Sequence, residues 1–251
     1  MSYTRQLNSN GIPPFEDLPL GKGDPPHSAW GLYGHKDERG ALNRLTNERV
    51  VAAAKTEIGT GVRISLNWPL SAQTPSGKSF FNRALFHQEV IHKAPRIVND
   101  DIWTFNTQVS SQWDGLRHFA YQKEEKFYNG VTLDDIHGEG FQTGNVTKDV
   151  QTTVLGVQAM AEQGIVGRGI LLDYHSWRLS QPNPQPYDAF KPGSITLSDL
   201  KAVAQAQRTD IRFGDILIIR SGIPPPFPFF LSNLQRQIHI TPTHFNSTPK
   251  M

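Results

Sequence analysis

The chain has 251 residues, enough for one large domain or two small ones and for a substantial hydrophobic core. Its formal net charge is only +2 and the charges are interspersed, which argues against a nucleic-acid or membrane-surface partner. The absence of cysteine excludes disulfides, cysteine-ligated zinc and thiol nucleophiles, and fits a cytoplasmic protein. We see no secretory signal, and no apolar run approaches the roughly 18 residues of a membrane span.

The sequence of the N-terminal part predicts an extended arm, followed by a helix. Residues 1–28 form the predicted arm, because Pro13-Pro14 and Pro25-Pro26 oppose helix. Thr46 is predicted to cap a helix from Asn47 to Ile58, which Gly59 ends.

Two strand candidates come next. Val62 to Leu66 alternates apolar and polar residues, the pattern of a half-buried strand. Leu85 to Ile91 is the second candidate, and we expect His87 and Glu89 on its solvent face.

The second half of the domain predicts two helix-then-strand units. Val154 to Gln163 is a predicted helix leading to a strand at Ile170–Leu172. Thr196 and Asp199 resemble a capping box opening a helix through Gln207, which leads to a strand at Ile216–Ile219. Both strands are unbroken apolar runs, typical of parallel central strands covered on both faces. The fold class is therefore α/β, with a mixed sheet and a few helices.

The composition changes abruptly at Ile223. Residues 223–251 begin with a proline- and phenylalanine-rich run and contain no acidic residue. Two interpretations remain open: a disordered partner-binding tail, or an alternative reading of the coding sequence. We expect the domain to comprise residues 29–222.

The stretch from Phe105 to Gly130 carries the strongest chemical signal. Asp114 and His118 are four residues apart, and Gln112 lies two positions before the carboxylate. Their oxygen and imidazole groups could converge on one divalent cation, with the histidine free to move a proton. On spacing alone, an Asp-x-x-x-His pair is more often a surface hydrogen bond.

Several separated motifs resemble the cyclase family of metal-dependent hydrolases, to which kynurenine formamidase and isatin hydrolase belong. The first is Asp114-Gly-Leu-Arg-His118, followed by Tyr128-Asn129-Gly130. The others, in chain order, are Trp30-Gly31, Gly40-Ala-Leu-Asn43, Leu66-Asn-Trp-Pro69, Gly167-Arg-Gly-Ile-Leu-Leu-Asp173 and Gly214-Asp-Ile-Leu-Ile-Ile-Arg220. The resemblance implies a swivelling β/β/α domain.

The resemblance also implies a site. The family pattern H-x-G-T-H-x-D-x-P-x-H places Gln108 and Gln112 at the two histidine ligands, Asp114 at the aspartate ligand and His118 at the proton-transfer histidine. The cofactor is then a divalent metal, manganese or zinc. A glutamine oxygen is a weaker zinc ligand than imidazole and suits manganese or magnesium better, so weak binding or none is a further expectation.

Three side chains are candidates for binding a small-molecule substrate: Arg117 for a carboxylate, and Trp113 and Tyr128 for an aromatic ring. The resemblance implies hydrolysis of an aryl formamide or a cyclic amide, as in tryptophan catabolism. It also leaves a homodimer open.

The sequence near the C-terminal end leaves two alternative functions open. Relatives continue beyond the match to Gly222 and bring a late glutamate, whereas the last acidic residue here is Asp215. One alternative is therefore an inactive, truncated member that acts as a binding protein or has no function. Another is a metal-independent cyclase or dehydratase acting on a secondary metabolite through Asp114 and His118.

Overall fold

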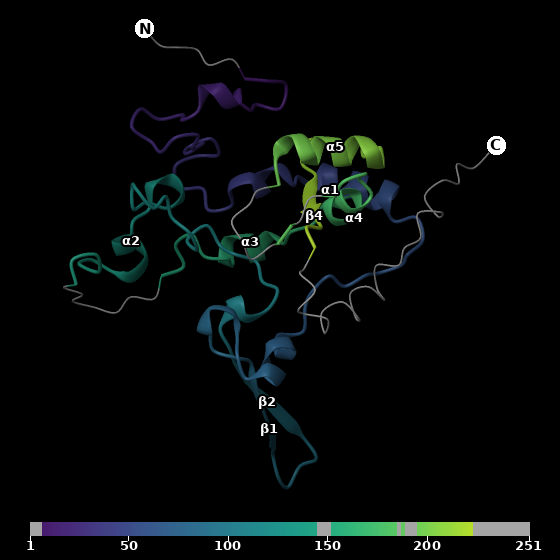
Figure 1. The fold of residues 1–251 in the computed structure, drawn as a ribbon. Coiled ribbons are helices and arrows are strands. Elements are labelled where there is room, and N and C mark those ends of the chain that lie inside the picture. Colours follow the sequence, from purple (N-terminus) through teal and green to yellow (C-terminus); the bar gives the residue numbers. More distant parts are fainter. Residues whose placement is uncertain (1–6, 145–151, 185–186, 189–194, 223–251) are drawn as a thin grey trace. The chain divides into compact units, whose positions relative to one another are not determined.

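The computed structural model describes residues 7–144, 152–184, 187–188 and 195–222 (Figure 1). The chain divides into two compact units. Among the described residues, the first unit contains the stretch up to Thr60 and the stretch from Asp114 onward, and the second is Gly61–Trp113. The tail expected at 223–251 lies outside the described residues.

The described residues form short helices and strands, as expected for an α/β chain. The α-helices are α1 Asn47–Glu57, α2 Leu133–His137, α3 Gln158–Gln163, α4 Tyr174–Leu179 and α5 Leu197–Gln207. The strands are β1 His87–His92, β2 Asn99–Thr104, β3 Gly169–Leu172 and β4 Ile216–Ile219. The 3-10 helices are Phe15–Asp17, Gly40–Arg44, Leu70–Ser76, Phe80–Asn82, Thr107–Val109 and Tyr128–Gly130.

The parallel pair predicted from the two apolar runs is confirmed. β3 and β4 pair in parallel, with Ile170 opposite Leu217 and Leu172 opposite Ile219. Helix α5 packs on β3 and on α4, beside β4 in Figure 1. Leu172 and Val203 are buried here, together with Tyr174 at the start of α4. Apolar burial between strand and helix therefore holds this part of the first unit together.

The expectation that both faces of these strands are covered is wrong for the described part of the chain. Ile170 and Leu172 are buried, but Leu171, Leu217 and Ile219 are exposed. The prediction from the unbroken apolar runs was therefore correct for the strand pairing and too high for the burial of the side chains. Alternation of side chains puts Leu171 on the face opposite Ile170 and Leu172. Leu217 and Ile219 lie on the same face as their register partners Ile170 and Leu172 and are still exposed, so α5 covers β3 better than β4.

Local capping chemistry fixed the helix starts as predicted. The Thr46 side chain accepts a hydrogen bond from the Arg49 backbone at the start of α1. At α5, Thr196 and Asp199 form a reciprocal capping box. These hydrogen bonds satisfy amide groups that have no partner within the helix, so the signal is readable from the sequence.

Two predicted elements are wrong in part. Residues 62–66 form no strand, and Val62 and Leu66 are exposed. Residues 154–157 form a turn and not the first turn of a helix, because Leu155 has a positive φ of 52° that a right-handed helix cannot contain. The helix that follows, α3, ends at Gln163 as predicted, with Gly164 as its C-cap.

The second unit contains the antiparallel hairpin of β1 and β2. β1 confirms the strand predicted at Leu85 to Ile91, displaced by one or two residues, and both His87 and Glu89 are exposed. Beside the hairpin, Gln73 is buried and receives a 2.7 Å hydrogen bond from the Phe80 backbone. Its own amide donates to the Val109 carbonyl.

The N-terminal residues pack more closely than an extended arm requires. The described part, from residue 7, includes the 3-10 helix Phe15–Asp17, and Pro25 and Ser28 are fully buried. Of the described helices, none is long and apolar enough to cross a membrane.

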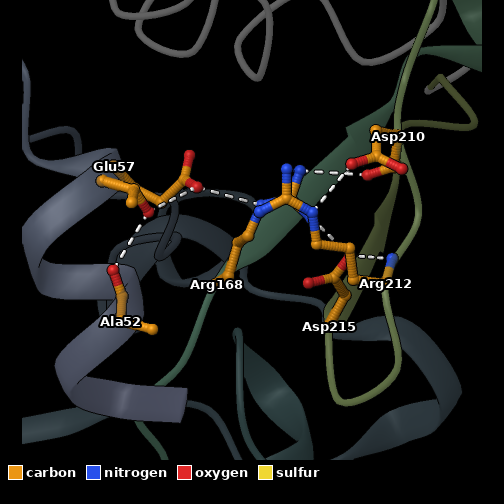
Figure 2. Close-up of polar contacts among 7 residues, drawn as sticks. Ala52, Glu57, Arg168, Asp210, Arg212 and Asp215 are labelled. Atoms are coloured by element: carbon orange, nitrogen blue, oxygen red, sulfur yellow. Dashed lines mark hydrogen bonds and ion pairs between the residues drawn. The ribbon is translucent and has the colours of Figure 1, made fainter. Parts of the chain in front are cut away.

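An arginine joins α1 to the sheet. Arg168 donates to Glu57 at 3.1 Å and to the Asp215 carboxylate at 2.8 Å (Figure 2). A further bond runs from Arg168 to the Asp210 carbonyl at 3.0 Å. The Asp215 side chain is only 6% exposed, and removing the cation that pairs with a buried carboxylate is destabilising.

We predict that Arg168→Met lowers the free energy of unfolding by about 2–4 kcal/mol, because it leaves the Asp215 carboxylate buried without its cation. The measurement is the urea midpoint at constant pH. The matched control is Arg212→Met, which removes an exposed pair with Asp210 and keeps the backbone bond from residue 212 to Asp215. Equal effects of the two substitutions would contradict the assigned role of Arg168.

Candidate functional site

The two residues at the centre of the sequence prediction lie close together in the first unit. Asp114 Oδ1 and His118 Nδ1 are 3.8 Å apart, and each side chain is roughly two-fifths exposed. This separation is too long for a direct hydrogen bond. It suits a shared water or ion between a carboxylate and an imidazole that both reach solvent.

The residues between Asp114 and His118 anchor the pair to the segment 152–157. The Arg117 backbone donates to the Leu155 carbonyl at 3.1 Å, and its Nη1 donates to the Thr152 carbonyl at 2.7 Å. Gly115 lies directly on the same segment, because an added Cβ would be 2.8 Å from the Leu155 oxygen. Gly115 and Arg117 therefore fix the loop that carries both functional groups.

Leu155 is in turn held from two sides. Its side chain is 2% exposed and packs in a core cluster with Phe127 and Ile136, which Leu116 also touches. Its backbone N–H donates to Glu38 Oε1 at 2.8 Å. The loop of the candidate site is thus tied through Leu155 to the core and to a carboxylate far away in sequence.

Tyr128 is placed by a second polar network. Its hydroxyl donates to Asp37 Oδ2 at 2.9 Å, and Asp37 also accepts from the Gly40 backbone and from Asn43. Burial, followed by this hydrogen bond to Asp37, raises the pKa of Tyr128 well above its usual value. Its hydroxyl therefore remains protonated at neutral pH.

Asn129 completes that network and brings the sequence motifs together. Its side chain accepts from the Gly31 backbone at 2.9 Å and donates to the Gly34 carbonyl at 3.0 Å. The motifs at Trp30-Gly31, Gly40–Asn43 and Tyr128–Gly130 thus form one set of interlocked turns. The polar contacts of these motif residues hold the backbone of the turns in place.

The carboxamides and Trp113 belong to the second unit. Gln112 Nε2 donates to Gln108 Oε1 at 3.2 Å, so the two predicted ligands are neighbours within that unit. Trp113 is about half exposed. The structure therefore brings Asp114 together with His118 in the first unit, and Gln108 together with Gln112 in the second.

The donor chemistry fits a hard, loosely held ion better than a tightly bound zinc. Within the described ranges, no group of three or more histidine, aspartate or glutamate side chains could hold a metal. Asp114 supplies one carboxylate, and the two glutamines supply neutral carbonyl oxygens. Oxygen ligands of this kind suit Mn²⁺ or Mg²⁺, and a tetrahedral zinc site prefers imidazole or thiolate.

Sequence reasoning missed the carboxylates that support the site. Glu38 and Asp37 lie in a turn with no periodic pattern, and their partners are about a hundred residues away. The nearby Gly40–Asn43 motif was the only signal that this turn matters. Asp173, the last residue of another motif, caps α4 by accepting from the Ser176 backbone at 3.0 Å.

Asp173 also pairs with a cation at the ends of the parallel strands. Arg220 donates to it at 2.7 Å. Burial raises the pKa of Asp173, but hydrogen bonds from Ser176 and from Arg220 outweigh it and bring the pKa below its usual value. Burial, followed by the charges of Arg220 and Arg178, lowers the pKa of the neighbouring His175.

Comparison with known proteins gives a consistent picture. Residues 62–227 match the family model named Cyclase. Among solved structures, the crystal structure of a novel cyclase is similar, with a TM-score of 0.59 and 31% sequence identity. The match covers 76% of this chain and 60% of that one, so this chain spans less than two thirds of its relative. No curated protein matches.

We predict that Gly115→Ala disturbs the site, because the new methyl group would clash with backbone atoms of Leu155, Gly156 and Val157. These atoms can move away only if the whole segment shifts. Overpacking of this kind lowers the free energy of unfolding by about 1–3 kcal/mol. The urea midpoint measures it. Gly59→Ala is the control, since an added Cβ there meets nothing within 4 Å. Tolerance of alanine at position 115 would show that this close approach does not exist.

Proposed function

The chain belongs to the cyclase family, and on that premise we propose that it is a metal-dependent hydrolase of an amide or cyclic amide, similar to arylformamidases. The observation that carries the proposal is the Asp114–His118 pair, 3.8 Å apart and open to solvent. The reaction breaks a carbon–nitrogen bond, and water supplies the new oxygen.

His118 is the proposed acid–base residue. Its imidazole is exposed enough to contact a water molecule, and its spacing from Asp114 leaves room for one. The imidazole takes a proton from the attacking water and then gives a proton to the leaving nitrogen. The hydrogen bond from the His118 backbone to the Gly115 carbonyl, at 3.0 Å, fixes the turn that presents the ring.

Asp114, Gln112 and Gln108 are the proposed metal-binding residues. The argument for the glutamines is sequence proximity, since Gln112 is two positions from Asp114. When bound, a divalent ion would polarise the substrate carbonyl and lower the pKa of a coordinated water. Manganese is the better match to these donors, and zinc the poorer one.

The proposed substrate is a small aryl formamide or cyclic amide, with tryptophan catabolism as the setting and the cytoplasm as the location. Trp113 offers an exposed aromatic face, and Tyr128 a hydroxyl that is already engaged by Asp37. Arg117 is the proposed partner of a substrate carboxylate. Its Nη1 also donates to backbone carbonyls in the described structure, so the same side chain would hold the loop in position.

A metal-independent reaction is the second candidate. The observation that favours it is that Asp114 and His118 already form a pair in which one group could accept a proton and the other donate it. Such a pair supports ring closure or dehydration without any ion.

The test uses the full chain, stripped with a chelator and reloaded with Mn²⁺, Zn²⁺ or Mg²⁺, with N-formylkynurenine as substrate. We expect hydrolysis with Mn²⁺ and a loss of about a hundredfold or more in His118→Ala, because general acid–base catalysis is removed. His92→Ala, which changes an exposed histidine of β1, should retain full activity.

The outcomes separate the candidates. Calorimetry with Mn²⁺ should show binding that Asp114→Asn weakens. Activity on a cyclisation or dehydration substrate that resists chelation would favour the metal-independent reaction. Absence of both metal binding and hydrolysis, with every ion tried, would refute the hydrolase and favour an inactive binding protein.

A further inference from the structure

An apolar cavity in the first unit lies apart from the Asp114–His118 pair. Its volume is about 440 Å³. This is within the range of roughly 300–1,000 Å³ that is typical of small-molecule sites. It opens between α5 and the face of the β3–β4 sheet that α5 covers, and no residue of the sequence motif at 114–118 lines it.

The wall of the cavity is aliphatic. The sheet contributes alternate residues from one face, and α5 contributes residues one turn apart, so both elements direct apolar groups to the same space. These residues are Ile170, Leu172, Leu217, Leu197, Leu200 and Ala204. Leu197 and Leu217 are more than half exposed, so solvent now contacts carbon atoms that a ligand could cover.

The rim of the cavity is cationic. Arg44, Lys201 and Arg212 line it, against a single acid, Asp215. Two carboxylates near the rim are already engaged: Asp215 is held by Arg168 at 2.8 Å and by the Arg212 backbone at 2.7 Å, and Asp210 pairs with the Arg212 side chain at 2.7 Å (Figure 2). Lys201 is exposed. Arg44 and Lys201 therefore give the rim a positive charge for an anion.

One side of the rim is fixed before any ligand arrives. The Arg44 guanidinium lies over the Phe213 ring at 5.2 Å, and Arg49 lies over the same ring at 5.0 Å. Arg44 also donates to the Tyr33 hydroxyl at 2.7 Å. These contacts hold the Arg44 side chain in place, which reduces the entropy lost when it binds an anion.

We propose that this cavity binds an apolar carboxylic acid, with its hydrocarbon part between α5 and the sheet and its carboxylate at Arg44 and Lys201. A neutral apolar molecule would gain binding free energy only from the aliphatic wall, and a small polar anion only from the cationic rim. A carboxylate with a hydrocarbon tail would gain binding free energy from both. The site stands independently of the proposed hydrolase activity, because the two share no residue.

The test is calorimetric titration of the full chain with octanoate and 4-phenylbutanoate, which distinguish a flexible aliphatic tail from an aryl one. Binding of either, saturable at one per chain, supports the site. Hexanoate should bind more weakly than octanoate by about fourfold per missing methylene, because each buried CH₂ contributes to transfer. Octan-1-ol should bind more weakly than octanoate.

Two variants and one control complete the test. Lys201→Glu should weaken octanoate by about five- to tenfold and leave octan-1-ol unchanged, because it replaces attraction with repulsion at the rim. Ala204→Phe should abolish binding of both by filling the cavity. Lys55→Glu, which changes another exposed lysine, on α1, should have no effect. Absence of saturable binding, or equal affinity for octanoate and octan-1-ol, would overturn the proposal.

Discussion

The close contact between Gly115 and the backbone at Leu155 is the constraint on which the candidate site depends. Here the loop that carries Asp114 and His118 meets a segment about forty residues later without a side chain between them, at 2.8 Å from the position of a Cβ. The Arg117 backbone bond to Leu155 fixes the register of the two segments. Because Leu155 is buried, the positions of both functional groups are set by the core.

This arrangement divides the motif Asp114–His118 into two kinds of residue. The carboxylate and the imidazole reach solvent, and the three residues between them face the protein. Leu116 joins the core cluster, Gly115 allows the backbones to meet, and Arg117 clamps the Thr152 carbonyl. The middle residues of the motif are therefore constrained by packing and hydrogen bonds, and only the two end residues are candidates for chemical roles.

The sequence predicted what local interactions determine. The caps of α1 and α5 and the pairing of β3 with β4 follow from side-chain hydrogen bonds and apolar runs, and they are confirmed. Cyclase-family membership was also predicted correctly, because several motifs occur in order. Three predictions were wrong: the strand at Val62 to Leu66, the helix start at Val154 and the coverage of both sheet faces. The support of Leu155 by Glu38 was not predicted at all. No local pattern encodes a carboxylate that binds a backbone over a hundred residues away.

Amide hydrogen exchange of the full chain tests the central claim most directly. The account predicts that the amides of Leu155 and Arg117 exchange far more slowly than in an unstructured peptide, because one donates to Glu38 and the other to the Leu155 carbonyl. Glu38→Ala should speed up exchange at both positions, and Glu38→Gln, which keeps an acceptor oxygen, should largely preserve it. Unprotected exchange at Arg117 in the unsubstituted protein would contradict the account.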